Sequence, residues 1–354
     1  MKQLNRMRPT EAMLTDTLAK RMPGKVYNLS AGDPNLPVCE ALRRAYLSAD
    51  MELTHNYGAS IGLKSLREKL WKRPEEVIIA NGAKQLIYMS LAAITAPGDN
   101  VVIIGPCWTS YMRICELLGL NYTLVVGNAE SLYVPSMEDV LSAIDSNTAA
   151  VLLNNPNNPT GAVYSDAFIG SLLNAVRTNN SRLISDEIYR LLSEKPFASL
   201  RGEKDVIVID GFSKSLSITG WRLGYAIAEE EIISAMTGIQ SQMSGPPSTL
   251  IQTIVDAAFD QLEFRSFADY KDRIDLLCSL PKFAAARPKA GFYFYLPIDE
   301  RWESSRALCE HLLKEHSIAI TPGDEYGVPR TVRISVAYET VDALNEILEY
   351  LRII

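Results

Sequence analysis

Short apolar runs rich in valine, isoleucine and leucine alternate with segments of helical spacing through the first two thirds of the chain. The runs are predicted to be strands, at Val77–Ala80, Val101–Ile104, Tyr122–Val126, Ala149–Leu153, Leu183–Ser185, Val206–Ile209 and Tyr225–Ala228. The segments between them predict amphipathic helices, at Ala83–Thr95, Tyr111–Leu118, Met137–Ile144 and Asp166–Arg177. Strands that are apolar at every position are buried on both faces. The pattern therefore predicts an α/β protein with a mostly parallel, seven-stranded type of sheet sandwiched by helices.

The two ends of the chain show a different rhythm. Ahead of the alternating region we expect a short strand and two helices, at Val26–Ser30, Glu40–Leu47 and Leu63–Trp71. After about Pro247 we expect one long helical stretch from Ser248 to about Leu277, and then an aromatic, alternating strand at Gly291–Leu296. The last elements are a helix, two strands and a closing helix, at Arg306–Glu315, Ile318–Thr321, Val332–Val336 and Val341–Leu351.

These patterns divide the chain into an arm and two domains. A chain of 354 residues is long enough for two domains, each with its own core. Residues 1–25 are predicted to form an amphipathic N-terminal arm, which ends at Pro23 and Gly24. Residues 49–247 are assigned to the large domain. Residues 26–48 and 248–354 are assigned to a smaller α+β domain.

The composition excludes several classes of function. The formal net charge is −7 with acidic and basic residues interleaved, whereas a nucleic-acid partner would require a basic stripe. No apolar run approaches the about 20 residues that a membrane helix needs. The first eight residues lack the apolar core of a signal peptide. The five cysteines are scattered without a CxxC pair, as in a cytoplasmic protein with reduced thiols and no metal site.

Three reactive side chains follow the predicted strand Val206–Ile209, namely those of Ser213, Lys214 and Arg222. A lysine just past such a strand lies where α/β proteins bind their ligands. An amine held away from bulk water can attack a carbonyl to form a Schiff base, and a guanidinium binds phosphate through two hydrogen bonds. Together they suggest an aldehyde cofactor that carries a phosphate, pyridoxal 5'-phosphate. A surface lysine with a structural arginine is the alternative.

Polar residues also follow two other predicted strands. The run from Asn154 to Gly161 places amides at the mouth of the sheet, where an amide can donate to an anionic oxygen; a plain turn is the alternative. Asp186 follows Leu183–Ser185, and a buried carboxylate there would keep a pyridine nitrogen protonated. The phenol of Tyr189, three residues on, could bind the ring's O3'. A helix-capping aspartate is the alternative for Asp186.

Three weaker signals complete the set. The segment from Asn81 to Gln85 joins a strand to a helix, and small residues at a helix start leave N–H groups open to phosphate. Trp108 could stack on a flat ring, although both features are equally consistent with packing. Arg333 lies inside an apolar strand, where a charged residue is rarely unpaired. A substrate carboxylate would pair with it, and a sheet-edge arginine is the alternative.

Taken together, these motifs resemble the aspartate aminotransferase class I/II family of fold type I enzymes, which use pyridoxal 5'-phosphate. The resemblance runs nearly end to end, through residues 30–34, 56–58, 81–85, 154–161, 186–189, 213–214, 219–225 and 332–335. It implies that Lys214 bonds to the cofactor and shuttles a proton. It also implies that Asp186 pairs with the pyridine nitrogen, that Tyr189 and Asn158 bind O3', and that Trp108 stacks on the ring.

The resemblance implies the remaining site residues as well. The cofactor phosphate would be held by Ala83, Lys84, Ser213 and Arg222, and Tyr57 would reach the phosphate of a neighbouring subunit. The α-carboxylate of the substrate would be held by Gly32, Asn158 and Arg333. The family is usually a homodimer with its sites at the interface. No residue that would pair with a second carboxylate is identified, so a dicarboxylate substrate is not predicted.

The function implied by the resemblance is transfer of an amino group from an L-amino acid to a 2-oxo acid, through a Schiff base at Lys214 and a pyridoxamine form. A pyridoxal-phosphate-dependent lyase on the same fold is an alternative, for example a carbon–sulfur β-lyase or a synthase of aminocyclopropane carboxylate. These enzymes share Asp186, Lys214, Arg222 and Arg333, so the motifs do not separate them. A cofactor-binding regulator is a further alternative. Such regulators carry a basic DNA-binding segment ahead of the domain, and only about 25 residues precede the first predicted strand here.

Overall fold

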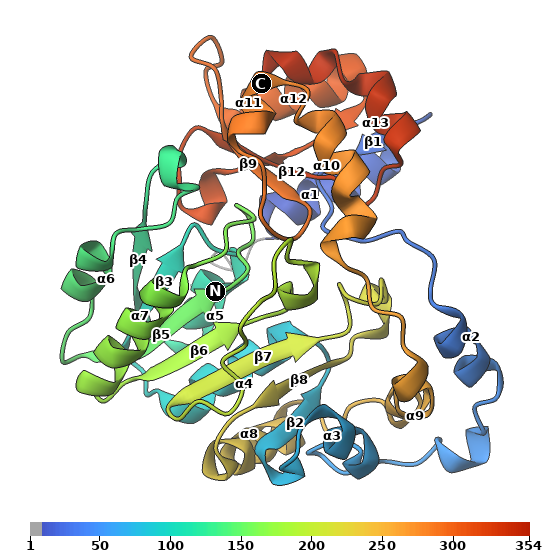
Figure 1. Ribbon diagram of the computed structural model, residues 1–354, viewed down its shortest axis with the longest axis vertical. Coiled ribbons are helices and arrows are strands. Elements are labelled where there is room, and N and C mark those ends of the chain that lie inside the picture. The colour runs from blue at the N-terminus through green and yellow to red at the C-terminus, as the bar shows by residue number, and fades with distance from the viewer. Residues whose placement is uncertain (1–8) are drawn as a thin grey trace, which may run out of the picture.

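The computed structural model describes residues 9–354, and a seven-stranded sheet runs through its larger part (Figure 1). The strands occur in the order β2-β8-β7-β6-β5-β3-β4. Their bounds are β2 Val77–Ala80, β3 Asn100–Gly105, β4 Asn121–Val126, β5 Thr148–Asn154, β6 Arg182–Asp186, β7 Val206–Gly211 and β8 Gly224–Ile227. Only β8 is antiparallel to its neighbours, β2 and β7. The predicted mostly parallel sheet is confirmed.

Helices cover both faces of this sheet because successive strand residues point to opposite sides. In β5, Ala150 and Leu152 pack with helices on one face, whereas Val151 and Leu153 pack with helices on the other. The first face is covered by α4 Ala83–Ile94, α5 Ser110–Leu118 and α8 Glu230–Met243. The second is covered by α6 Met137–Ala143 and α7 Asp166–Thr178, and near β2 by α2 Glu40–Leu47, α3 Lys64–Leu70 and α9 Thr249–Ala258.

A second, smaller assembly lies beyond the carboxyl ends of the parallel strands (Figure 1). Its three-stranded antiparallel sheet has the order β11-β12-β9, with bounds β9 Tyr293–Pro297, β11 Thr321–Pro322 and β12 Thr331–Ser335. It is packed by α10 Lys271–Leu277, α11 Pro281–Ala285, α12 Ser305–His316 and α13 Val341–Ile347. The short strand β1, Tyr27–Asn28, pairs in parallel with β10, Ile318–Ala319. This pairing connects the segment after α1 to the smaller assembly. The predicted domain boundaries at residues 25, 48 and 247 stay a prediction.

The N-terminal arm forms a helix, α1, over Glu11–Arg21. Thr10 caps its first turn, because its hydroxyl accepts a hydrogen bond from the N–H of Met13. Residues 1–8 of the predicted arm lie outside the described residues.

The predicted long helix from Ser248 to Leu277 is wrong. α9 ends at Ala258 and α10 begins at Lys271, with two short 3₁₀ turns between them, Phe259–Gln261 and Phe267–Tyr270. A new start is specified locally, because Ser266 and Asp269 cap each other's backbone in a capping box. The N–H of Arg265 donates to the carbonyl of Ser215, 2.6 Å away, which ties the break to the Lys214 segment. Helical spacing alone does not reveal such an interruption. The pattern also gave no element between Ala228 and Ser248, where α8 lies.

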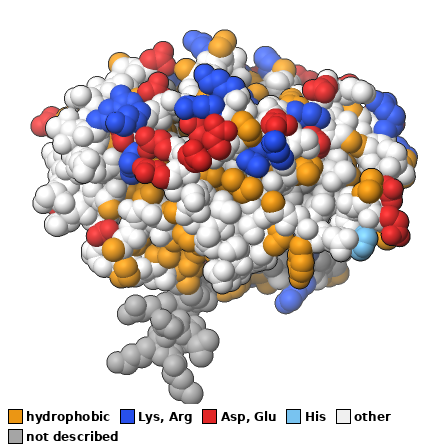
Figure 2. Space-filling view, turned by 90° about the horizontal axis from the view of Figure 1, so that it is seen from below, with side chains coloured by type: hydrophobic (Ala, Val, Ile, Leu, Met, Phe, Trp, Pro, Cys, Tyr) orange, Lys and Arg blue, Asp and Glu red, His pale blue; other side chains and the backbone are white. Residues whose placement is uncertain are grey.

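Charge of both signs is interleaved on the surface as well as along the sequence. On the face in Figure 2, basic and acidic side chains lie next to one another, with hydrophobic side chains between them. Among residues 9–354, no helix combines the length and the apolar character needed to cross a membrane. All five cysteines are free thiols, and the cytoplasmic location stays a prediction.

Candidate active site

A cavity of about 380 Å³ opens where the carboxyl ends of the parallel strands meet the smaller sheet and helix α1. Strand register explains why polar residues gather there. Asn154 at the end of β5 lies beside Asp186 at the end of β6, and β7 ends next to them at Gly211, just before the Lys214 segment. Every predicted site residue except Tyr57 lines this cavity, namely Gly32, Ala83, Lys84, Trp108, Asn158, Asp186, Tyr189, Ser213, Lys214, Arg222 and Arg333.

The amine of Lys214 lies in the wall of the cavity. Its Nζ donates a hydrogen bond of 2.6 Å to the carbonyl oxygen of Gly32. Burial lowers the pKa of this amine from 10.5 to about 8; Asp33 opposes the change, and Arg333 and Arg222 add to it. An amine with this pKa is partly neutral near physiological pH, which both nucleophilic attack and proton transfer require.

The carboxylate of Asp186 is buried and held from two sides. Its Oδ2 accepts a hydrogen bond of 2.7 Å from the hydroxyl of Tyr111, and its Oδ1 accepts one of 3.1 Å from the N–H of Ile188. Burial raises the pKa of Asp186 to about 6, although both hydrogen bonds favour the ionised form. The side chain is therefore an anion at neutral pH, fixed in place and available to a cationic partner.

Tyr111 is a site residue that the sequence reasoning missed. Burial, and then the charge of Asp186, raises the pKa of this phenol well above its ordinary value, so it stays protonated and donates. Its ring packs edge to face on Trp108, with centroids 5.6 Å apart. The available signal was its place three residues after Trp108 at the start of a helix, which looks the same as core packing.

The asparagine run at the end of β5 forms a turn that is held by side-chain hydrogen bonds. Asn154 Oδ1 accepts a 2.7 Å hydrogen bond from the N–H of Asn158, and Asn154 Nδ2 donates to the carbonyl of Asp186 at 2.9 Å. Asn158 Oδ1 in turn accepts from Arg333 Nη1 at 3.3 Å. The run therefore connects the end of the large sheet to the arginine of the smaller one.

Arg333 is 4% exposed and has spare capacity for an anion. Its Nη2 donates to the carbonyl of Ser30 at 2.6 Å, and its guanidinium carbon lies 4.6 Å from the ring centroid of Tyr293 and 5.1 Å from that of Tyr326. Its Nε is buried without a partner, and within residues 9–354 no acidic side chain pairs with it. A buried guanidinium without a carboxylate is costly unless a ligand supplies one.

A second anion cradle lies at the start of helix α4. Gly82 precedes this helix with φ of +85° and gives it no side-chain cap, so the N–H groups of Ala83 and Lys84 lack a partner within the helix. Arg222 lies directly across, where its Nη2 donates to the carbonyl of Asn81 at 3.3 Å. A helix N-terminus next to a guanidinium suits a phosphate.

The amine of Lys84 is a further cation in the cavity. It lies 4.8 Å from the ring centroid of Trp108. Burial, and then the charge of Arg222, lowers the pKa of Lys84, and no acidic side chain of the described residues contributes. The side chain of Lys84 can therefore bind an anion separately from its backbone N–H.

Tyr189 and Tyr293 close the remaining wall. Their hydroxyl oxygens are 3.1 Å apart. Tyr293, which the sequence reasoning also missed, belongs to the predicted aromatic strand. Its hydroxyl lies 1.8 Å from where a Cβ on Gly32 would be, so this position has room for glycine only. Tyr57, in contrast, is 95% exposed and outside the cavity, and its predicted role stays a prediction.

The chain is similar to known aminotransferases both in sequence and in structure. A family model described as aminotransferase class I and II matches residues 24–351. The aspartate aminotransferase of Thermotoga maritima is 31% identical over 96% of this chain and 95% of that protein. The aspartate/prephenate aminotransferase of Thermus thermophilus is 30% identical over 95% and 94%. A structure of Thermus thermophilus aspartate aminotransferase with maleate has a TM-score of 0.90 at 30% identity, covering 99% of this chain and 98% of that one.

Proposed function

The chain belongs to the aminotransferase class I and II family and transfers an amino group from an amino acid to a 2-oxo acid, and from this premise we propose that its cofactor is pyridoxal 5'-phosphate and its amino donor a dicarboxylic amino acid such as L-aspartate. The presence of two separate cations in one cavity, Lys84 and Arg333, carries the proposal about the donor.

The cavity fits the phosphate end of the cofactor. The unpartnered N–H groups at the start of α4, the hydroxyl of Ser213 and the guanidinium of Arg222 belong to residues that line the same cavity and could together bind a phosphate. A Cβ on Gly82 would lie 2.6 Å from Arg222 Nη2, so the absence of a side chain keeps the cradle open. A volume of about 380 Å³ is within the range of small-molecule sites.

The cavity also fits the ring and the aldehyde. Lys214, with its pKa lowered to about 8, would hold the aldehyde carbon covalently, and Asp186 would hold the protonated ring nitrogen. Trp108 would cover one face of the ring, and Tyr189 and Asn158 would bind its O3'. When bound, the cofactor supplies an electron sink for negative charge at the substrate's α-carbon.

The protein's own residues then orient the donor and move a proton. Arg333 would bind the α-carboxylate through its free donor, assisted by Asn158. Lys214 would take the proton from the α-carbon and return it to the cofactor side, as a base with a pKa near the working pH can do. Asp186 stays ionised, because Tyr111 and Ile188 donate to both of its oxygens.

The choice of a dicarboxylic donor depends on the side chain of Lys84. An α-amino acid with one carboxylate uses Arg333 and leaves the amine of Lys84 without an anion. A second carboxylate would pair with that amine next to Trp108. The relatives named aspartate aminotransferase and the neighbour solved with maleate, a dicarboxylate, support the same class.

An amino-donor panel tests the proposal. Each donor is added to the holoenzyme without a 2-oxo acid, and conversion of the cofactor is followed by absorbance. We expect L-aspartate and L-glutamate to react with the highest kcat/KM. In Lys84→Met the kcat/KM for these two should fall about 10- to 100-fold, the effect of losing one charged hydrogen bond, with alanine changed less than about threefold.

Two further variants serve as controls for Lys84→Met. Lys64→Ala removes a lysine that is exposed and outside the cavity, and should leave the panel unchanged. Arg333→Ala should raise the KM for every donor, because the α-carboxylate is common to all. Equal losses for aspartate and alanine in Lys84→Met would contradict the assigned role of Lys84. A wild-type preference for donors with neutral side chains would contradict the dicarboxylic donor.

We also propose that the protein is a homodimer in which Tyr57 completes the partner's phosphate site. Large apolar side chains are exposed along one segment of the chain, at Tyr46, Leu47, Met51, Leu53 and Tyr57, with exposed fractions from 56% to 95%. An exposed apolar patch of this kind is typical of an interaction surface.

Subunit exchange tests the dimer. Two inactive variants, Lys214→Ala and Tyr57→Ala, are mixed, exchanged and assayed. We expect hybrid dimers to regain activity, since one of the two sites then carries both native residues. A monomeric mass in solution, or no recovery after proven exchange, would contradict the shared site.

A further inference from the structure

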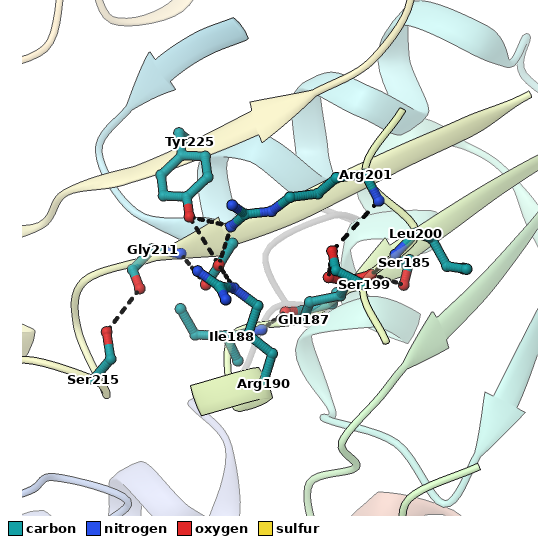
Figure 3. Close-up of polar contacts among 12 residues, drawn as sticks. Ser185, Glu187, Ile188, Arg190, Ser199, Leu200, Arg201, Gly211, Ser215 and Tyr225 are labelled. Carbon is teal, nitrogen blue, oxygen red and sulfur yellow. Dashed lines mark hydrogen bonds and ion pairs between the residues drawn. The ribbon is translucent and has the colours of Figure 1, made fainter. Parts of the chain in front are cut away.

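A buried network of charged groups lies on the face of the large sheet opposite the cavity. Asp186 faces α5 and the cavity, and its register partner Ile209 packs on that same face. Because side chains alternate along a strand, the next residues, Glu187 and Asp210, point to the other face. Figure 3 shows the side chains of Arg190, Arg201 and Tyr225 converging there.

The carboxylate of Asp210 is the centre of this network. Its Oδ2 accepts hydrogen bonds from Arg190 Nε at 2.5 Å, Arg201 Nη2 at 2.6 Å and the hydroxyl of Tyr225 at 2.8 Å. Its Oδ1 accepts from the N–H of Gly211 at 2.6 Å. Asp210 is only 4% exposed, so these charge-assisted bonds are shielded from water and strong.

The partners of Asp210 belong to the two segments that carry the reaction. Arg190 directly follows Tyr189 and begins a short helix, Arg190–Leu192. Gly211 opens the turn that leads to Lys214, three residues later. Tyr225 is the register partner of Asp210 on β8 and fixes the carboxylate from the sheet.

Glu187 extends the network on the same side. Its Oε1 accepts from the hydroxyl of Ser185 and from the N–H of Leu200, and its Oε2 accepts from the hydroxyl of Ser199. These bonds hold the loop that supplies Arg201. The segments that carry Asp186 and Lys214 are thus held together by hydrogen bonds to two buried carboxylates, those of Glu187 and Asp210, on the opposite face of the sheet.

We propose that Asp210 is a positioning residue for the transamination reaction: by binding Arg190 and Arg201 on the far face of the sheet, it holds the Lys214 segment in register with the segment that carries Asp186 and Tyr189. The inference rests on the proposed role of Lys214 as the proton carrier. Proton transfer needs the amine at a fixed place relative to the ring that Asp186 orients. A misplacement of about 1 Å costs on the order of 100-fold in rate.

The test is Asp210→Asn in the holoenzyme. The amide keeps the shape of the carboxylate but leaves two arginines without their anion. We expect kcat, per active site titrated with the cofactor, to fall about 10- to 100-fold, with the KM for the donor within about threefold, because Arg333 and Lys84 are untouched. The kinetic isotope effect for a donor deuterated at the α-carbon should rise, since proton transfer then limits turnover.

The other end of the same strand offers a matched control. Asp205, directly before β7, accepts a 2.5 Å hydrogen bond from Arg182 Nη1 and is not among the residues that line the cavity. Its φ of +65° suits asparagine as well as aspartate. Asp205→Asn therefore also removes the negative charge from an aspartate–arginine pair, here between the starts of β7 and β6. Its kcat and isotope effect should stay at the wild-type values.

Three results would overturn the inference: a kcat for Asp210→Asn within twofold of wild type, an equal loss in Asp205→Asn, or an unchanged isotope effect. If Asp210→Asn does not fold, Tyr225→Phe removes one donor and no charge, and should lower kcat about fivefold. Failure of the donor proposal is a separate outcome. If alanine or phenylalanine is the better donor, the same comparison is made with that donor and still decides the role of Asp210.

Discussion

At the scale of single residues, burial shifts the pKa values of two ionisable groups in the cavity toward neutral pH, one from above and one from below. The pKa of Lys214 is lowered to about 8 and that of Asp186 is raised to about 6. Perturbed groups of opposite type in one cavity are typical of a catalytic site. Both side chains are therefore unfavourable for folding in their charged forms, which gives a stability test that is independent of turnover.

Asp186→Asn should make the cofactor-free protein more stable above pH 6. The folded pKa of Asp186, about 6, exceeds the ordinary value of 3.8, so between these values the folded state binds more protons than the unfolded state. Stability due to this group is present below pH 3.8 and is lost as the pH rises through 6, by about 3 kcal/mol. Urea unfolding at several pH values measures it. Parallel curves for wild type and variant would contradict the raised pKa, and near-normal turnover of the variant would contradict the role in binding the ring.

Site residues that interrupt the apolar pattern of a strand or helix could be predicted from the sequence. Site residues that fit this pattern could not. Lys214, Asp186 and Asn158 stand out because they are polar and follow buried strands. Tyr111 and Tyr293 lie within a helix and a strand, where an aromatic residue looks like ordinary core. Their hydroxyl groups matter only through partners that are distant in sequence.

At the scale of elements, the strands at the centre of the large sheet were predictable because nearly every position in them is buried, as in β5 and β7. The break between α9 and α10 was not, because it depends on the caps at Ser266 and on a contact with Ser215. Helix α4 is the element whose terminus matters most. Its first turn presents free N–H groups to the cavity, and this works only while Gly82 leaves room for Arg222.

Gly82→Ala tests the cradle at the start of α4. Gly82 has φ of +85°, and a Cβ there would lie 2.6 Å from Arg222 Nη2. We expect the dissociation constants for pyridoxal 5'-phosphate and for inorganic phosphate to rise at least about tenfold, because Arg222 must move. The matched control is Gly98→Ala, where φ is +97° but nothing lies within 4 Å. It should lose about 1–2 kcal/mol of stability from backbone strain alone, with unchanged phosphate affinity. Equal affinities in Gly82→Ala and wild type would contradict a phosphate site at α4.

At the scale of the whole molecule, the site exists only where distant parts of the chain meet. The large sheet supplies Asp186 and Lys214, the smaller sheet supplies Tyr293 and Arg333, and helix α1 covers the cavity from the N-terminal side. The sequence lists these residues in order but gives no distances between them. The family resemblance provided their arrangement, whereas the position of the Lys84 amine beside Trp108 and the hydrogen-bond network around Asp210 required the folded chain.

The most direct measurement of the central claim is a map of the covalent cofactor bond. The purified protein is loaded with pyridoxal 5'-phosphate, reduced with borohydride, digested and analysed by mass spectrometry. The account predicts one reduced pyridoxal phosphate per chain, on the peptide that contains Lys214, and none when the protein is first converted with excess L-aspartate. A label on Lys84 or scattered over surface lysines, or no label at all, would contradict it.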